Sequence, residues 1–184
     1  VPDGIVAERI DSAGYSLAAQ LDKDGIAALE AGGTRNGNAT ALTSTTTYKQ
    51  FVALRTQLSK NKVPTSGRFA LVNPDVVGYL LEDTTHFVRA SQLGDSVVQS
   101  GAIGRIAGFT VYECTEMTAT TEIIVGHPDW CHRVREWAVD VHVQDLSGSG
   151  TYIGASAVQG RMVYAHKVSK AAAVLYKSTA AISG

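Results

Sequence analysis

The feature that most constrains this chain is the long amphipathic segment with which the sequence begins. One face of this segment carries apolar residues at spacings of three and four, and these are Ile5, Val6, Ile10, Ala13, Leu17, Leu21, Ala28 and Leu29. The pattern predicts a single α-helix over residues 2–31, closed by the glycine pair that follows. Such a helix is roughly 40 Å long, which is long for so small a chain.

The rest of the sequence predicts an interleaved mixture of elements. Residues 48–63 read as a second amphipathic helix, Asn73 is placed to cap a short helix, and residues 34–47 are polar and predict a loop. Runs of β-branched and aromatic residues at 68–72, 106–114, 121–127 and 138–146 predict strands, and 128–137 predicts one or two helical turns. Residues 152–182 fit helix and strand equally well. The order of these elements predicts an α+β fold.

Composition excludes several classes of protein. The 184 residues carry a net charge of −1, so there is no basic excess to neutralise a nucleic-acid backbone over the whole surface. Apolar runs fall far short of the roughly 20 residues that cross a bilayer, and two cysteines are too few for a disulfide framework. The length fits one large domain or two lobes that share a core. Because the chain starts at Val1, we expect that an upstream segment has been removed or is not represented.

The stretch GAIGRIAGFTVYECTEM, residues 101–117, raises the question of a phosphate-binding loop. A dinucleotide loop needs the spacing G-x-G-x-x-G between a strand and a helix, so that backbone N–H groups meet the pyrophosphate. Gly101, Gly104 and Gly108 instead follow the spacing G-x-x-G-x-x-x-G and lead into a strand. We therefore expect these glycines to shape a turn and a strand entry, with no cofactor bound.

The segment HPDWCH is the only cluster of potential metal ligands in the sequence, and it contains His127, Asp129, Cys131 and His132. A zinc site needs four ligands, or three and a water, and nothing in the spacing of His142 or His166 supplies the missing pair. The sequence also lacks a nucleophile elbow and an H-E-x-x-H motif. We therefore predict no catalytic, cofactor-binding or metal-binding residues. An enzyme that uses His127, His132 and His142 is the less favoured alternative.

Three stretches in a fixed order carry a resemblance to a known family: GRFALVNPDVVGYLLED at 67–83, the glycine-bounded stretch at 101–117, and IIVGHPDW at 123–130. This order resembles that of the major capsid (coat) proteins of tailed bacteriophages. In that family a strand ending in V-x-P precedes a short helix, and a G-x-I-G-R-I-x-G-F-x-V segment leads into a strand. The opening helix is similar to the end of their spine helix, and residues 163–176 resemble their C-terminal stretch.

The resemblance implies the tailed-phage (Hong Kong phage) capsid fold. A peripheral lobe then contains the long spine helix, and an axial lobe contains a central mixed sheet flanked by helices. By this resemblance residues 1–46 are the spine helix and following loop, 47–147 the axial lobe, and 148–184 a return to the peripheral lobe. The N-terminal arm and extended hairpin, or E-loop, that precede the spine helix in the family are expected to be lacking here.

The resemblance also implies a function. The chain would be a structural subunit, not an enzyme, that self-assembles into the icosahedral shell around phage or prophage DNA. Its partners would be copies of itself in hexamers and pentamers, scaffolding, portal and decoration proteins, and packaged DNA through weak non-specific contact, with no membrane. It would be made in the bacterial host cytoplasm and located in the virion. A nanocompartment shell protein of the same fold, and a sugar-binding module that uses Trp130 and Trp137, are further alternatives.

Overall fold

The computed structural model describes residues 3–93, 101–136, 140–146, 150 and 156–181. The chain divides into two compact units, the first formed by residues 1–132 with 167–184 and the second by residues 133–166. The predicted lobe ranges of 1–46, 47–147 and 148–184 stay a prediction, because a division into compact units does not test a division into lobes. The C-terminal stretch returns to the main sheet of the first unit, where it forms an internal strand.

Helix α1, Asp3–Gly32, confirms the long helix predicted from the apolar stripe. Its C-terminal half packs within the first unit, where Leu21 and Ile26 are buried and Leu29 contacts the sheet. Glu30 fixes this end, because its carboxylate accepts hydrogen bonds from the Thr118 backbone N–H at 3.2 Å and the Thr118 hydroxyl at 2.5 Å. Earlier in the apolar stripe, Ile10 and Ala13 are exposed and Leu17 is half-buried.

The first unit is built on a seven-stranded mixed sheet with the order β1-β11-β6-β2-β5-β4-β3. Its strands are β1 (Thr34–Arg35), β2 (Phe69–Val72), β3 (Val88–Arg89), β4 (Gly104–Ile106), β5 (Phe109–Glu113), β6 (Thr121–Gly126) and β11 (Val174–Ser178). The pairs β1–β11 and β2–β5 are parallel, and the others are antiparallel. Strands from both ends of the chain therefore meet in one sheet.

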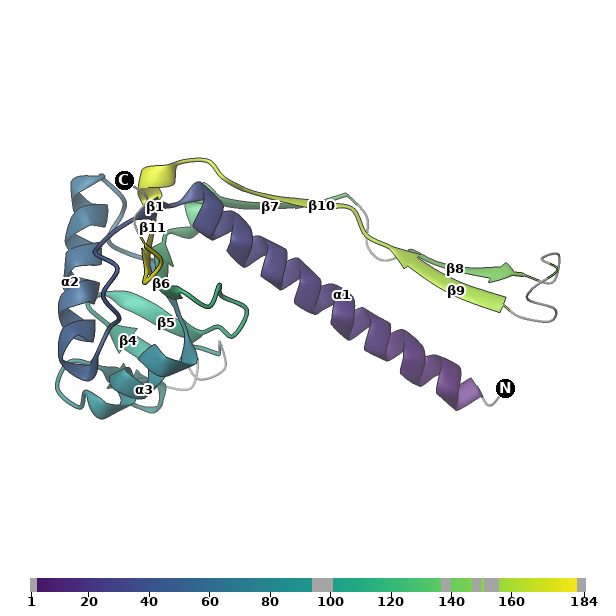
Figure 1. Cartoon of the computed structure of the whole chain (residues 1–184), viewed down its shortest axis with the longest axis horizontal. Coiled ribbons are helices and arrows are strands. Elements are labelled where there is room, and N and C mark those ends of the chain that lie inside the picture. The colour runs from purple at the N-terminus through teal and green to yellow at the C-terminus, as the bar shows by residue number, and fades with distance from the viewer. Residues whose placement is uncertain (1–2, 94–100, 137–139, 147–149, 151–155, 182–184) are drawn as a thin grey trace. The chain divides into compact units, whose positions relative to one another are not determined.

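Helices cover both faces of this sheet (Figure 1). On one face lie α2 (Ser44–Lys60) and α3 (Pro74–Glu82), and the C-terminal end of α1 packs on the other. Phe51, Leu54 and Leu58 of α2 are fully buried in the main core, and each contributes about 1.5–3 kcal/mol through burial. The central mixed sheet flanked by helices confirms the predicted α+β class. The short α4 (Ala90–Leu93) follows β3.

Local capping explains where two of these helices begin. Asn73 caps α3 as predicted, since its Oδ1 accepts a hydrogen bond from the Val76 backbone N–H at 3.0 Å. In α2 the prediction was wrong at the start, because the helix begins at Ser44, inside the stretch predicted as a loop. Thr43 and Thr46 form a capping box that satisfies the first N–H groups, and this outweighs the poor helix propensity of threonine.

Two other predicted elements differ in the structure because a turn interrupts each of them. The single strand predicted over 106–114 is a hairpin, because Ala107 (φ 47°) and Gly108 (φ 85°) reverse the chain between β4 and β5. The predicted helical segment at 128–137 is one 3₁₀ turn, Pro128–Trp130, followed by β7 (Cys131–Arg135). Its last residue, Trp137, lies outside the described residues.

The second unit is a pair of two-stranded ribbons. Strand β7 pairs with β10 (Tyr164–Val168), and β8 (Asp140–Asp145) pairs antiparallel with β9 (Ser156–Arg161). The stretch at 152–182, which the sequence left open between helix and strand, thus contains β9, β10, a 3₁₀ turn at Ala171–Ala173 and β11.

Among the described helices of the chain, none combines the length and the apolarity needed to cross a membrane.

Candidate functional site

The histidine cluster is used for packing. His127 follows β6 as a buried residue. Its Nε2 lies 3.0 Å from the Ser66 carbonyl oxygen, and its Nδ1 accepts from the Asp129 backbone N–H at 3.3 Å. Both ring nitrogens are therefore occupied. His132 is exposed, with Nε2 2.9 Å from the Ser169 hydroxyl, while His142 lies on β8 in the other unit. In the part of the chain that the structure describes, no three His, Cys, Asp or Glu side chains are grouped to hold a metal ion.

Neither cysteine is suited to act as a nucleophile. Burial raises the pKa of the Cys131 thiol. Burial also raises the pKa of the Cys114 thiol, and the negative charge of Glu116 acts in the same direction. Since the thiolate is the reactive form, both groups are poorly reactive near neutral pH.

Trp130 belongs to a packed corner of the first unit. Its ring meets the His127 ring edge-on, with centroids 5.3 Å apart, and the Lys170 ammonium lies 5.4 Å from the ring centroid. The same ammonium donates to the Asn61 carbonyl oxygen at 3.1 Å. Trp130 thus joins the turn after β6 to the end of α2. This position gives no support to the sugar-binding alternative.

The three glycines of the 101–117 stretch have backbone and packing roles. Gly101 (φ 74°) and Gly108 (φ 85°) take conformations that L side chains rarely adopt. At Gly104 a Cβ atom would overlap the Phe87 ring and the Val88 carbonyl oxygen, since β3 passes directly beside it. The glycines shape a strand entry and a hairpin turn, as the sequence predicted.

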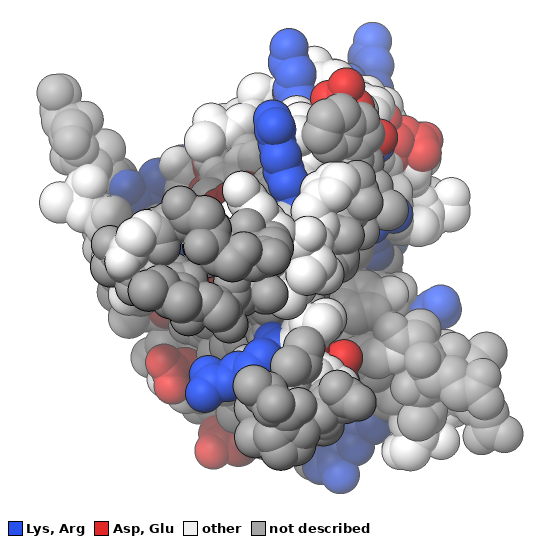
Figure 2. Space-filling view, turned by 90° about the vertical axis from the view of Figure 1, so that its right-hand side faces the viewer, with Lys and Arg blue, Asp and Glu red and all other residues white. Residues whose placement is uncertain are grey.

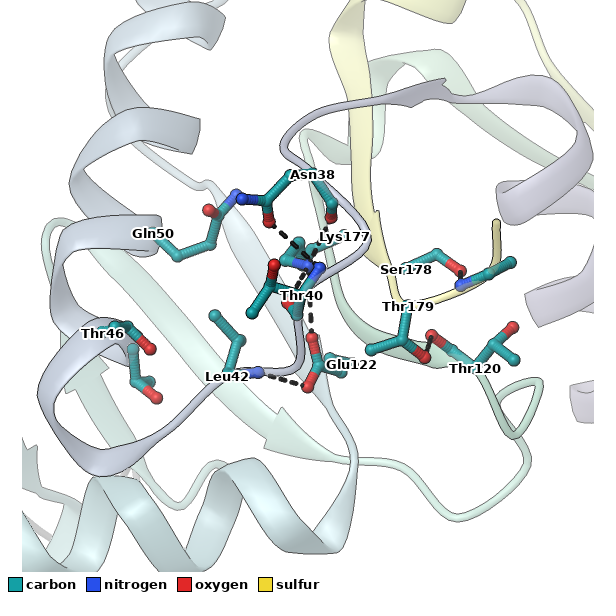
Figure 3. A network of polar contacts seen from close by, with 12 residues as sticks. Asn38, Thr40, Leu42, Thr46, Gln50, Thr120, Glu122, Lys177, Ser178 and Thr179 are labelled. Carbon is teal, nitrogen blue, oxygen red and sulfur yellow. Dashed lines mark hydrogen bonds and ion pairs between the residues drawn. The ribbon is translucent and has the colours of Figure 1, made fainter. Parts of the chain in front are cut away.

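A buried polar network lies beneath the loop that joins β1 to α2 (Figure 3). Lys177 of β11 is 1% exposed, and its ammonium donates to the carbonyl oxygens of Asn38 and Thr40, both at 2.7 Å. The Glu122 Oε2 atom lies 3.6 Å from the same ammonium. The other carboxylate oxygen, Oε1, accepts from the Leu42 backbone N–H at 2.7 Å. Two oppositely charged side chains therefore hold the loop through its backbone.

This network was not predicted from the sequence. Its polar partners come from residues 38–42, 122 and 177, which are far apart in the chain. The one local signal is a lysine in the otherwise strand-forming segment VLYKS. By fixing the loop to β6 and β11, the network places the start of α2, and hence the helix layer, against the sheet.

Large apolar side chains are exposed at several places. On α1, Ile10 is exposed and Tyr15 is 82% exposed. In the second unit, Val134, Val143 and Val158 are exposed on the ribbons. A two-stranded ribbon is at best marginally stable alone in water, and exposed apolar surface commonly marks a site of interaction with another protein.

A family model described as phage capsid protein matches residues 2–176. The chain belongs to this family of phage capsid proteins. No curated protein matches this capsid protein. The match confirms the family that the ordered motifs predicted.

Solved structures agree with the family. A chain of Mycobacterium phage Che8 is similar with a TM-score of 0.76 and 20% identity, over 95% of this capsid protein and 63% of that chain. The capsid of Cyanophage P-SCSP1u gives a TM-score of 0.73 and 15% identity, over 96% of this capsid protein and 66% of that chain. A virus-like particle from Pyrococcus furiosus is similar with a TM-score of 0.62 and 13% identity, over 91% of this capsid protein and 64% of that chain. The capsid protein thus has the tailed-phage capsid fold and spans about two thirds of the length of these chains.

Proposed function

We propose that this capsid protein is a structural subunit of an icosahedral shell, and that its function is to associate with copies of itself in hexamers and pentamers. The observation that carries the proposal is the family match over residues 2–176. The similarity to the Che8 chain over 95% of the capsid protein gives further support. In this proposal no side chain reacts with a substrate, and the role is structural, not catalytic.

The exposed apolar residues of α1 and of the second unit give the proposal a physical basis. A contact of ordinary size buries about 1,600 Å² in total. Repeated head-to-tail contacts closed by symmetry stabilise each subunit by mass action. Tyr15 and Val143, which are 82% and 71% exposed, are suited to lie in such contacts. Burying these side chains in a contact would stabilise the assembly, because it removes apolar surface that the separate subunit exposes to water.

The other partners follow from the same proposal. The capsid protein would be made in the host cytoplasm and be part of the virion, with a scaffolding protein, a portal and decoration proteins as further partners. Packaged DNA would touch it weakly and without sequence preference. On the face drawn in Figure 2, the described acidic and basic side chains are interspersed, which is compatible with weak contact.

Expression of the complete gene product, alone and with its neighbouring scaffold gene, tests the proposal. Negative-stain microscopy should reveal closed particles built from capsomers. A protein that stays monomeric under every condition, scaffold included, would overturn the proposal.

A nanocompartment shell is the second candidate, favoured by the similarity to the virus-like particle from Pyrococcus furiosus. Nuclease-treated particles separate the two functions, because a phage shell retains protected DNA whereas a nanocompartment retains a cargo protein.

A further inference from the structure

Charge is segregated between two consecutive segments of the capsid protein. Residues 31–74 hold six of the 16 Lys and Arg residues and none of the 17 Asp and Glu residues. Residues 75–88 hold three acids and no Lys or Arg. The first segment contains α2, and the second contains nearly all of α3 and the turn after it. Segregation of this kind in adjacent elements calls for a physical reason.

The solvent-facing side of α2 is basic. Since Phe51, Leu54 and Leu58 point into the core, the opposite side carries Lys49, Val52, Thr56 and Lys60, all exposed. Val52 is 39% exposed. Within the described residues, neither Lys49 nor Lys60 forms a salt bridge. We call Lys49, Val52 and Lys60 the basic face.

A buried arginine adds to the positive potential near the end of α2. Arg68 is 3% exposed, and its guanidinium donates to the carbonyl oxygens of Pro64 and Val63 at 2.7 Å, to that of Arg55 at 3.3 Å, and to the Ser59 hydroxyl at 3.2 Å. All of these partners are neutral. Burial, and then the positive charge of Arg55, lower the pKa of Arg68. Among the described residues no carboxylate forms a salt bridge with this guanidinium.

The solvent-facing side of α3 is acidic. Val76 and Leu80 point into the core, which leaves Asp75, Gly78, Leu81 and Glu82 exposed on the other side. Leu81 is 46% exposed. We call these four residues the acidic face. Like the basic face, it combines one exposed aliphatic residue with two like charges.

Gly78 lies at the centre of the acidic face and is not explained by packing within the subunit. A Cβ atom at this position would meet nothing within 4 Å, and no positive φ requires glycine there. Glycine inside a helix lowers helix stability relative to alanine. A glycine on an exposed helix face does, however, allow another backbone or side chain to approach closely.

We propose that the acidic face of α3 docks on the basic face of α2 of a neighbouring copy, in a repeated head-to-tail contact between capsid subunits. The proposal rests on the proposed shell function. Each copy carries both faces, because α2 and α3 pack against each other on the same side of the sheet. A repeated contact therefore needs no second kind of subunit.

The chemistry of the two faces favours a second copy over a polyanion. Leu81 meets Val52 at the centre, Gly78 allows the helices to approach, and the acids and lysines pair around this apolar contact. An apolar centre with a polar rim is typical of protein interfaces, and complementary charge selects the partner and the register. A nucleic acid would use the lysines but would leave Leu81 and Gly78 without a role.

Charge reversal on the complete gene product tests the contact. The variant Lys49→Glu with Lys60→Glu, and the variant Asp75→Lys with Glu82→Lys, should each weaken self-association about tenfold or more, since like charges then face each other. The chain with all four changes should recover most of the association. Sedimentation velocity at constant salt measures this, and circular dichroism verifies that each variant is folded.

A control uses one exposed charge outside both faces. Lys167→Glu combined with Asp75→Lys and Glu82→Lys reverses a lysine elsewhere on the subunit, so it should not restore association. Two further variants do not depend on charge. Gly78→Ala should raise the melting temperature of the dissociated subunit and weaken association. A mixture of Val52→Cys and Leu81→Cys chains should form a disulfide between copies.

The outcomes separate this contact from the proposed function. Suppose that the wild type assembles, that the charge reversals and Gly78→Ala leave association unchanged, and that the cysteine mixture forms no disulfide between copies. The proposed contact is then wrong, and the shell function stands. If the wild type never associates, both are wrong. If Lys49→Glu with Lys60→Glu abolishes binding of a DNA duplex and leaves association unchanged, α2 is a nucleic-acid surface and the contact is overturned.

Discussion

Lys177 and Thr40, which are 137 residues apart in the chain, are joined by a hydrogen bond of 2.7 Å from the ammonium to the carbonyl oxygen. This bond ties β11 to the loop before α2 (Figure 3). The segment after the long helix and the C-terminal stretch are thereby held as parts of one unit. The integrity of the sheet thus depends on a contact between distant parts of the sequence.

Replacing Lys177 should therefore be costly. Lys177→Met leaves the carboxylate of Glu122 buried without its cation, so we expect the free energy of unfolding to fall by about 3–5 kcal/mol. Urea unfolding followed by circular dichroism measures this loss. Adding Glu122→Gln should recover part of it, because no buried charge then remains. Lys167→Met, at an exposed position, serves as the control and should change stability by less than about 0.5 kcal/mol. A loss below about 1 kcal/mol for Lys177→Met would contradict the role given to the network.

Replacing Arg68 even by lysine should lower the stability of the fold. A lysine keeps the charge but has only three donors, so it cannot reach all four neutral acceptors that the planar guanidinium bonds in the turn after α2. We expect Arg68→Lys to lower the free energy of unfolding by about 2 kcal/mol. The same change at the exposed Arg55 should stay within about 0.5 kcal/mol. Equal effects at the two positions would argue against the turn-holding role of Arg68.

The elements that the sequence predicted well are those specified by local signals. The apolar stripe of α1 and the Asn73 cap of α3 each lie within one segment, so periodicity and capping rules reach them. The turn at Ala107 was missed because strand-forming residues stand on both sides of it and alanine seldom takes a positive φ. Lys177 was missed for another reason: its acceptors belong to distant segments, and no local pattern reports a tertiary contact.

The fit of β3 against β4 predicts a strong penalty at Gly104. Gly104→Ala should lower the free energy of unfolding by about 1–3 kcal/mol, because the new methyl group overlaps the Phe87 ring and the Val88 carbonyl oxygen. Thermal unfolding of the two proteins measures this effect. Gly14→Ala is the matched control, since a Cβ atom there meets nothing within 4 Å, and it should raise helix stability by up to about 1 kcal/mol. Similar effects at the two positions would show that packing at Gly104 is looser than described.

Low pH should destabilise the turn after α3. Burial alone would raise the pKa of Asp83, but hydrogen bonds from the backbone and ring of His86 and from the backbone of Thr85 outweigh it, and the pKa is lowered. Because the folded pKa lies below the unfolded value, ionised Asp83 stabilises the fold above about pH 4, and this contribution is lost as the pH falls through the folded pKa.

The difference in unfolding free energy between the wild type and Asp83→Asn should therefore be largest near pH 7 and shrink in acid. Glu113→Gln, at an exposed position, is the control for loss of a carboxylate. An NMR titration that places the pKa of Asp83 at or above the ordinary aspartate value of 3.8 would rule out this explanation.

Cryo-electron microscopy of particles purified from cells that express the complete gene product tests the central claim most directly. The shell account predicts closed icosahedral particles whose reconstruction contains six-fold and five-fold clusters of this fold. Particles of any other composition, or a purified product that is monomeric with and without its scaffold, would contradict it.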